Sequence, residues 1–141
     1  SVELDEMDYG GPYTFSLIGK DTVELKNVMV GEVWLCSGQS NMQWQVSQSN
    51  NAAEEMENAN YDNIRLFSVP RTVAETPQDD CIGEWSECSP QSVRSFSAVG
   101  YFFGRELLKN LDVPIGLIHS SWGGTPVEAE HREGRATALR R

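Results

Sequence analysis

An apolar run that stops abruptly at a polar turn limits the folds available to this chain. Residues 33–36, Val-Trp-Leu-Cys, are followed at once by Ser-Gly-Gln-Ser-Asn over 37–41. A short apolar run bounded by turn residues is typical of a strand that is buried on both faces. The sequence therefore predicts a buried strand that presents small polar groups at its end.

Strand and helix signals alternate after this first run. The sequence predicts a helix over 51–59, a strand over 63–69 and a long polar loop over 71–94. A second helix is predicted over 95–111, and the apolar run at 113–119 then ends in Ser-Ser-Trp-Gly-Gly. This alternation favours an α/β fold with a mostly parallel sheet covered on both faces.

The predicted helix over 95–111 has an apolar stripe and two glycines. The stripe, which we expect to face the core, consists of Val99, Phe103, Leu107 and Leu111. Gly100 and Gly104 lie on an adjacent face, and each costs about 1 kcal/mol relative to Ala in a helix. We therefore expect the glycine face to pack close to a sheet, and Asp112 to end the helix.

The residues before the first apolar run read as a hairpin. Residues 12–19 and 23–31 show alternation and β-branched content, and Lys20 and Asp21 separate them. We interpret these segments as the last strands of a β unit that precedes the strand and helix region.

Charge and hydropathy exclude several classes of partner. The chain of 141 residues has 21 acidic and 11 basic residues, a net charge of −10, which argues against binding to a nucleic acid. No apolar run is long enough to cross a membrane, and the first residues lack the pattern of a signal peptide. A neutral or sugar-like partner fits this composition better, and the oligomeric state stays open.

The three cysteines do not predict a metal site or a disulfide framework. No Cys-x-x-Cys or clustered Cys/His spacing occurs, and we expect no metal or organic cofactor. Cys36 is interpreted as a small buried hydrophobe, and an enzyme that uses Cys36 is a weaker alternative, since an apolar setting raises a thiol pKa. Cys81 and Cys88 would pair only in an oxidising compartment.

The two polar turns, at 37–41 and 120–125, have the composition of an acyl-transfer site. In open α/β sheets, ligands bind outside the carboxyl ends of the strands. A serine hydroxyl exposed at such an end, with backbone N–H groups of a glycine turn nearby, meets the needs of acyl transfer through an oxyanion. Asn41-Met42 departs from the Gly-x-Ser-x-Gly elbow of α/β-hydrolases. The sequence predicts that the two turns converge.

The same residues carry a resemblance to a known family. Residues 31–44, with Gly-Gln-Ser-Asn, and 114–129, with Ser-Trp-Gly-Gly-Thr, together resemble the sialate O-acetylesterase family of SGNH-type hydrolases. The resemblance implies an α/β fold with a three-layer flavodoxin-like sheet, incomplete here and preceded by the end of a β domain. It also implies a periplasmic, secreted or lysosome-like location, although this chain has no signal peptide and its compartment stays unknown.

The resemblance assigns roles to individual residues. It implies that Ser40 is the nucleophile and a backbone oxyanion donor, and that Gly123 or Gly124 provides a second donor, for a substrate that is an O-acetylated sugar. Three residues are weaker candidates for substrate binding: Gln39, Asn41 and Trp122. The alternatives stay open: Ser40 caps a helix, the glycines form a tight turn, and Trp34, Trp44 and Trp122 lie in the core.

The catalytic base that the family implies is not found in this sequence. Family members carry later Gln-Gly-Glu-x-Asn and Asp-x-x-His motifs, and neither occurs in the 141 residues. His119 is expected to be a packed or hydrogen-bonded strand residue, and His131 a surface residue. We therefore expect an esterase fragment that is weakly active or inactive, and the alternative is a noncatalytic carbohydrate- or partner-binding module.

Three units follow along the chain. Residues 1–29 are predicted to be the end of a β domain, 30–129 the first part of the esterase domain, and 130–141 a tail outside the family pattern. Residues 1–129 carry 19 acids and 7 bases, whereas 130–141 carry 2 acids and 4 arginines. We expect this tail to arise from a frame change or a truncation, and the alternative is a native surface helix.

Overall fold

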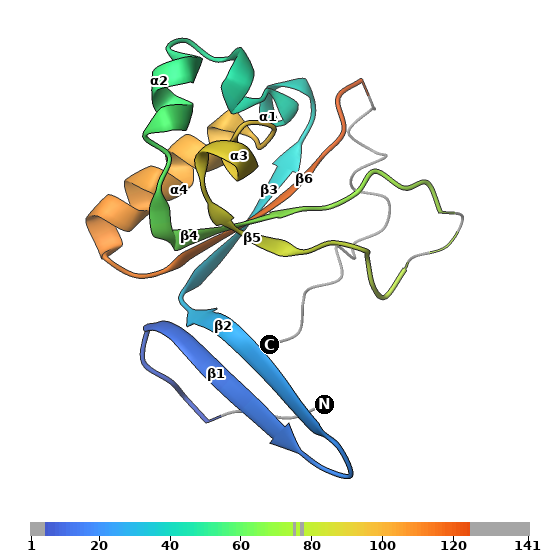
Figure 1. The fold of residues 1–141 in the computed structure, drawn as a ribbon. Helices are drawn as coiled ribbons and strands as arrows, with labels where there is room; N and C mark the ends of the chain where they lie inside the picture. The colour runs from blue at the N-terminus through green and yellow to red at the C-terminus, as the bar shows by residue number, and fades with distance from the viewer. Residues whose placement is uncertain (1–4, 75, 77, 125–141) are drawn as a thin grey trace.

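The computed structural model describes residues 5–74, 76 and 78–124 and contains two separate sheets (Figure 1). Strands β1 (Gly10–Ile18) and β2 (Thr22–Val30) pair antiparallel as a hairpin that projects from the rest of the molecule. The predicted hairpin is therefore confirmed. The predicted domain boundaries stay predictions, and residues 125–141, with the predicted tail, lie outside the described residues.

The second sheet has four strands in the order β3-β6-β4-β5. Strand β6 (Ile115–Ser121) lies between β3 (Glu32–Gly38) and β4 (Tyr61–Ser68) and is parallel to both. The prediction of a mostly parallel sheet is confirmed. The edge strand β5 (Trp85–Cys88) is antiparallel to β4.

The prediction of a loop over 71–94 is wrong for the second half of this segment. It contains β5 and the short helix α3 (Pro90–Val93), whose start is capped by reciprocal hydrogen bonds between Ser89 and Ser92. Four residues are too few to show a hydrophobic period. Pairing with β4 makes this segment a strand, and the Phe67 and Trp85 rings pack 5.3 Å apart across the pair.

The other helices follow the strands. Helix α1 (Ser40–Gln43) follows β3, and a 3₁₀ turn over Val46–Gln48 leads to α2 (Ala52–Glu57). Helix α4 (Ala98–Leu111) ends at Asp112, as predicted from the sequence. In the structure Asp112 is the C-cap residue and adopts a left-handed conformation with φ of 53°. No helix among the described residues is long and apolar enough to cross a membrane.

Helices cover only one face of the four-stranded sheet in the described part of the chain. Alternate residues on this face, among them Ile64, Leu66 and Leu117, are buried with Phe96 and Tyr101 from the helical layer. The opposite face carries Val33, Leu35 and Trp85, which are all exposed. The α/β class is confirmed, but coverage of both faces is not found among the described residues.

The first strand also differs from its prediction. The side chains of Val33, Trp34 and Leu35 are 59%, 41% and 54% exposed, whereas that of Cys36 is buried. Strand β3 is an edge strand here, because β6 pairs with it on one side only. The continuous apolar run is therefore typical of a strand with a second partner and a second covering layer, and neither lies within the described residues.

Helix α4 packs through its glycines rather than through the predicted stripe. A Cβ atom on Gly104 would lie 2.6 Å from Leu117 Cδ1, and one on Gly100 would lie 3.2 Å from Cys36 Sγ, so the close approach to the sheet is confirmed. Val99, Phe103 and Leu111 are exposed, and of the predicted stripe only Leu107 packs against the core. Val99 and Phe103 instead line an apolar hollow of about 290 Å³ beside β3.

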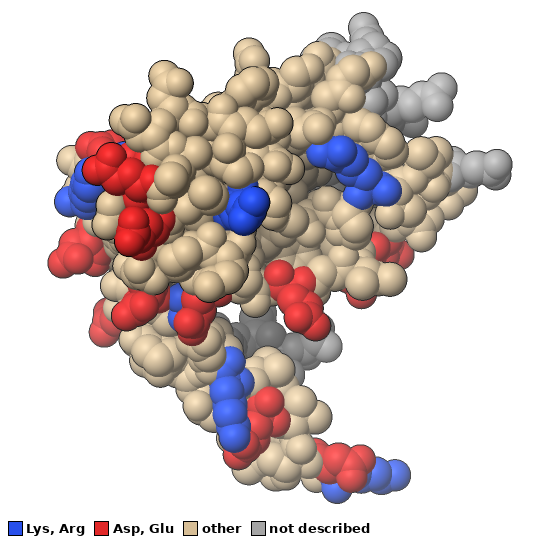
Figure 2. Space-filling view, turned by 45° about the horizontal axis from the view of Figure 1, so that its top comes forward, with Lys and Arg blue, Asp and Glu red and all other residues tan. Residues whose placement is uncertain are grey.

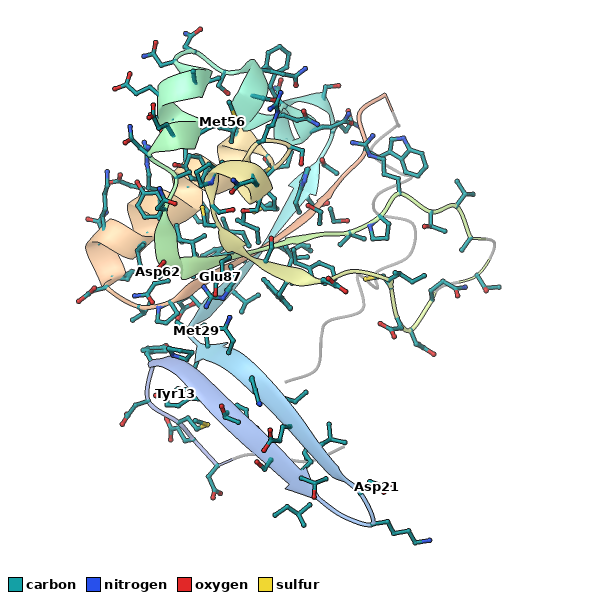
Figure 3. All side chains as sticks on the ribbon, in the orientation of Figure 1. Tyr13, Asp21, Met29, Met56, Asp62 and Glu87 are labelled. Carbon is teal, nitrogen blue, oxygen red and sulfur yellow. The ribbon has the colours of Figure 1, made fainter. Side chains whose placement is uncertain are left out.

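A polar junction joins the hairpin to the body. Asn27, with φ of 57°, donates from Nδ2 to Glu87 Oε1 at 2.9 Å and accepts from Arg65 Nη2 at 2.8 Å. Figure 3 shows Glu87 beside the near end of the hairpin, close to Met29, whereas Asp21 lies at the far tip. The carboxyl ends of β3 and β6 point away from this junction, toward α1 (Figure 1).

Candidate active site

The two polar turns lie side by side at the carboxyl ends of neighbouring parallel strands. Strands β3 and β6 pair from Glu32 opposite Ile115 to Gly38 opposite Ser121. The pairing continues one residue further, because Trp122 N–H donates to the Gly38 carbonyl at 3.2 Å. The predicted convergence of the turns is therefore confirmed.

Ser40 is the first residue of α1 and is exposed. Gln39 holds the N-cap position, where its side chain makes no capping hydrogen bond and its carbonyl accepts from Gln43 N–H at 2.9 Å. No other described residue hydrogen-bonds the Ser40 hydroxyl, so the hydroxyl is not a helix cap here. Asn41 follows it on α1 and is also exposed.

Gly123 is the glycine closer to Ser40. A Cβ atom on Gly123 would lie 3.4 Å from Ser40 Cα, whereas one on Gly124 would meet no atom within 4 Å. Gly124 has φ of +84°, a conformation that favours glycine, so the tight-turn interpretation holds for this residue. The geometry thus separates two glycines that the sequence left equivalent.

A glutamine that the sequence analysis did not single out occupies the space between the turns. Gln43 lies one helical turn after Ser40, and its Oε1 accepts a hydrogen bond from Gly123 N–H. Ser40, Gln43 and Gly123 line a polar hollow of about 330 Å³ together with Trp44 and Gln48. The spacing of three from Ser40 places Gln43 on the same side of α1, and this signal could have identified it.

His119 lies on β6, two residues before Ser121, and hydrogen bonds and a ring contact fix its side chain. Its Nε2 is 2.6 Å from Ser121 Oγ, and its ring packs edge-on against Phe96 at 5.3 Å. Burial lowers the pKa of His119, the charge of Arg71 lowers it further, and a backbone hydrogen bond with Met42 opposes both. The prediction of a hydrogen-bonded strand histidine is confirmed, while His131 lies outside the described residues.

The lowered pKa of His119 predicts a pH dependence of stability. Below pH about 6.5 the unfolded chain protonates this histidine while the folded chain resists protonation, so the free energy of unfolding should decrease as the pH falls. One such group changes the free energy of unfolding by at most about 1.4 kcal/mol per pH unit. Urea unfolding measured at several pH values in this range should show a weaker dependence of the free energy of unfolding on pH for His119→Gln than for the parent chain. Equal slopes in both proteins would contradict the assignment.

The cysteines and tryptophans considered in the sequence analysis do not add a nucleophile or a metal site among the described residues. Cys36 is buried against α4, and burial raises its thiol pKa, which disfavours it as a nucleophile. The described residues hold free cysteines at 36, 81 and 88 and no group of three or more potential metal ligands.

Trp34, Trp44 and Trp122 are all partly exposed, so none is a core residue here. Only Trp44 of these lines the hollow beside Ser40.

An α/β sheet that presents a serine and a glycine turn at adjacent strand ends has the groups that acyl transfer requires, and sequence comparison identifies the family. The model of the carbohydrate esterase family described as sialic acid-specific acetylesterase matches residues 30–139. The chain therefore belongs to this family of carboxylic ester hydrolases. The match runs past Ala129, where the family pattern was expected to end.

Named relatives agree with this family. The chain is 44% identical to a sialate O-acetylesterase from Pongo abelii and 43% identical to one from Homo sapiens, each over 91% of the chain and 27% of the relative. A carbohydrate acetylesterase from Xanthomonas citri has a similar structure, with a TM-score of 0.86 and 38% identity over 89% of this chain and 29% of that one. The chain thus spans little more than a quarter of these proteins.

Proposed function

We propose that this chain carries the nucleophile and part of the oxyanion site of a carbohydrate O-acetylesterase. The observation that supports the proposal most directly is the placement of the exposed residue Ser40 next to Gly123, in one polar hollow at the ends of two parallel strands. Membership in the carbohydrate esterase family supports an acetyl ester of a sugar as the substrate.

In this mechanism Ser40 Oγ attacks the acetyl carbonyl and forms a tetrahedral intermediate. The backbone N–H groups of Ser40 and Gly123 stabilise its oxyanion, and a general base supplied by the rest of the domain takes the hydroxyl proton of Ser40. The bond between the acetyl carbon and the sugar oxygen then breaks, and the sugar leaves as an alcohol with that proton. Water hydrolyses the remaining acetyl-Ser40 ester to acetate and the free hydroxyl.

Gln43 Oε1 accepts a hydrogen bond from Gly123 N–H in the same hollow that Ser40 lines, and this contact supports Gly123 N–H as a donor to an oxygen there. The substrate oxygen would replace Gln43 Oε1. Gln39, Asn41 and Trp122 are proposed to contact the sugar or to shape the turns.

We further propose that the chain alone is a weak esterase or an inactive one. An unassisted serine hydroxyl is a poor nucleophile. His119, the histidine among the described residues, contacts Ser121 and Met42 rather than Ser40. The purified chain should hydrolyse 4-nitrophenyl acetate at a rate close to that of its Ser40→Ala variant. A rate well above that of the variant would contradict this prediction.

A chimera tests the proposed function itself. Residues 30–124 of this chain would replace the matched part of the Xanthomonas citri carbohydrate acetylesterase, whose remaining sequence supplies the rest of the domain. We expect the chimera to release acetate from acetylated sugars. A chimera that is folded, binds sugar and releases no acetate would instead favour a noncatalytic binding module.

A further inference from the structure

The helix-covered face of β6 changes from apolar to polar at His119. Ile115 and Leu117 are buried in the core, and the next side chains on the same face of the strand are His119 and Ser121. The His119 ring packs edge-on against Phe96 at 5.3 Å, so it lies at the boundary between the core and the polar turn. The nitrogens of a partly buried imidazole require hydrogen-bond partners, and the structure provides one on α1 and one on β6.

The partner on α1 is the backbone of Met42. The last carbonyl groups of a helix have no donor within the helix, and α1 has only four residues. The backbone N–H groups of residues 45 and 46, which would reach the Met42 carbonyl in a longer helix, donate to other acceptors. The hydrogen bond between His119 and the Met42 backbone acts to raise the pKa of His119, which is the direction expected when a ring N–H donates to a carbonyl.

The partner on β6 is the hydroxyl of Ser121. Its Oγ lies 2.6 Å from His119 Nε2, and this contact leaves Nδ1 for the Met42 carbonyl. A neutral imidazole has one N–H donor and one acceptor nitrogen, which are the two groups that these contacts need. The segment that packs on the ring also contacts Met42, because Ser97, next to Phe96, donates from Oγ to Met42 Sδ at 3.3 Å.

The contact between His119 and Met42 joins the two elements that carry the proposed site. Ser40 lies two residues before Met42 on α1, and Gly123 lies four residues after His119. Helix α1 contains no charged residue, and the face turned to the viewer in Figure 2 is largely uncharged around its isolated basic groups. Tertiary hydrogen bonds and packing, rather than ion pairs, therefore hold this single helical turn in place.

We propose that His119 is a positioning residue: it holds α1 on β6 and so keeps Ser40 next to Gly123. In the neutral ring, Nδ1–H donates to the Met42 carbonyl and Nε2 accepts from the Ser121 hydroxyl. The use of this spacing in ester hydrolysis rests on the proposed function, whereas the spacing itself does not require catalysis.

The test is NMR spectroscopy of the ¹⁵N-labelled full chain. Long-range ¹H–¹⁵N spectra of the imidazole report which ring nitrogen carries the proton, and we expect Nδ1 of His119 to carry it at about pH 7. Solvent exchange of the Gly123 amide reports the contact between α1 and β6, since this amide donates to Gln43 Oε1. The Leu117 amide, in the buried part of β6, reports general stability. His119→Ala should accelerate exchange at Gly123 by at least about fivefold more than at Leu117.

Two conservative variants separate positioning from a merely structural role. The side-chain amide of His119→Asn reaches the place of Nδ1 and can still donate to Met42, so it should restore most of the protection of Gly123. The longer side chain of His119→Gln reaches the place of Nε2 and should not restore it. Ser120→Ala, on the other face of β6, is the matched control and should leave exchange at Gly123 unchanged.

Any of three results would overturn the proposal. These are a proton on Nε2 of His119, equal acceleration at Gly123 and Leu117 in His119→Ala, and equal protection of Gly123 in the Asn and Gln variants. In an active chimera, His119→Ala should lower kcat at least about tenfold with little change in KM, because a misplaced oxyanion donor acts on the transition state. An active chimera with unchanged kcat would overturn the proposal as well. If the chimera releases no acetate while the NMR results hold, the proposed function fails and the role of His119 stands.

Discussion

Replacing Ser40 with alanine should reduce acetate release by the active chimera by at least about 10³-fold. Removal of a serine nucleophile leaves only the catalysis that the oxyanion site and substrate binding supply. The value of kcat should carry the loss, because the hydroxyl forms its bond in the transition state and contributes little to ground-state binding. Steady-state kinetics with an acetylated sugar would measure both kcat and KM.

Ser37→Ala is the matched control for this change. Ser37 lies three residues earlier at the end of β3 and is likewise exposed, and it pairs opposite Ser120 in the sheet. Its removal should change kcat little. A Ser40→Ala chimera with full activity, or an equal loss in both variants, would show that Ser40 is not the nucleophile.

Gly31→Ala should destabilise the fold by roughly 3 kcal/mol, because a side chain cannot fit at this position without backbone movement. A Cβ atom on Gly31 would lie within 2.0 Å of the Pro114 carbonyl oxygen. The same carbonyl accepts from Glu32 N–H at 2.9 Å, immediately before β3 and β6 begin to pair. The added methyl group therefore separates the two strands that carry the proposed site.

Urea unfolding followed by tryptophan fluorescence would measure this loss. Gly19→Ala is the control, since a Cβ atom there would meet only Asp21 O at 3.7 Å, an ordinary contact. We expect Gly19→Ala to stay within about 0.5 kcal/mol of the parent chain. A similar small change for Gly31→Ala would contradict the close approach of Gly31 to Pro114.

Local signals in the sequence were sufficient for much of the fold and for the place of the site. Apolar runs that end at turn residues marked β3 and β6, and Asp112 marked the end of α4. The glycines of α4 indicated a helix packed closely on a sheet. These features depend on a few consecutive residues or on one helical face, so a single sequence displays them. The serine and glycine turns at the two strand ends followed from the same local pattern.

Tertiary structure alone decided the features that depend on residues far apart in the chain. Strand β5 exists because it pairs with β4, and the exposure of β3 depends on the absence of a second neighbour within the described residues. Gly123 was separated from Gly124 by its distance to Ser40, and Gln43 was identified by its hydrogen bond with Gly123 N–H. Strand pairing and burial are contacts between distant segments, and no local period in the sequence encodes them.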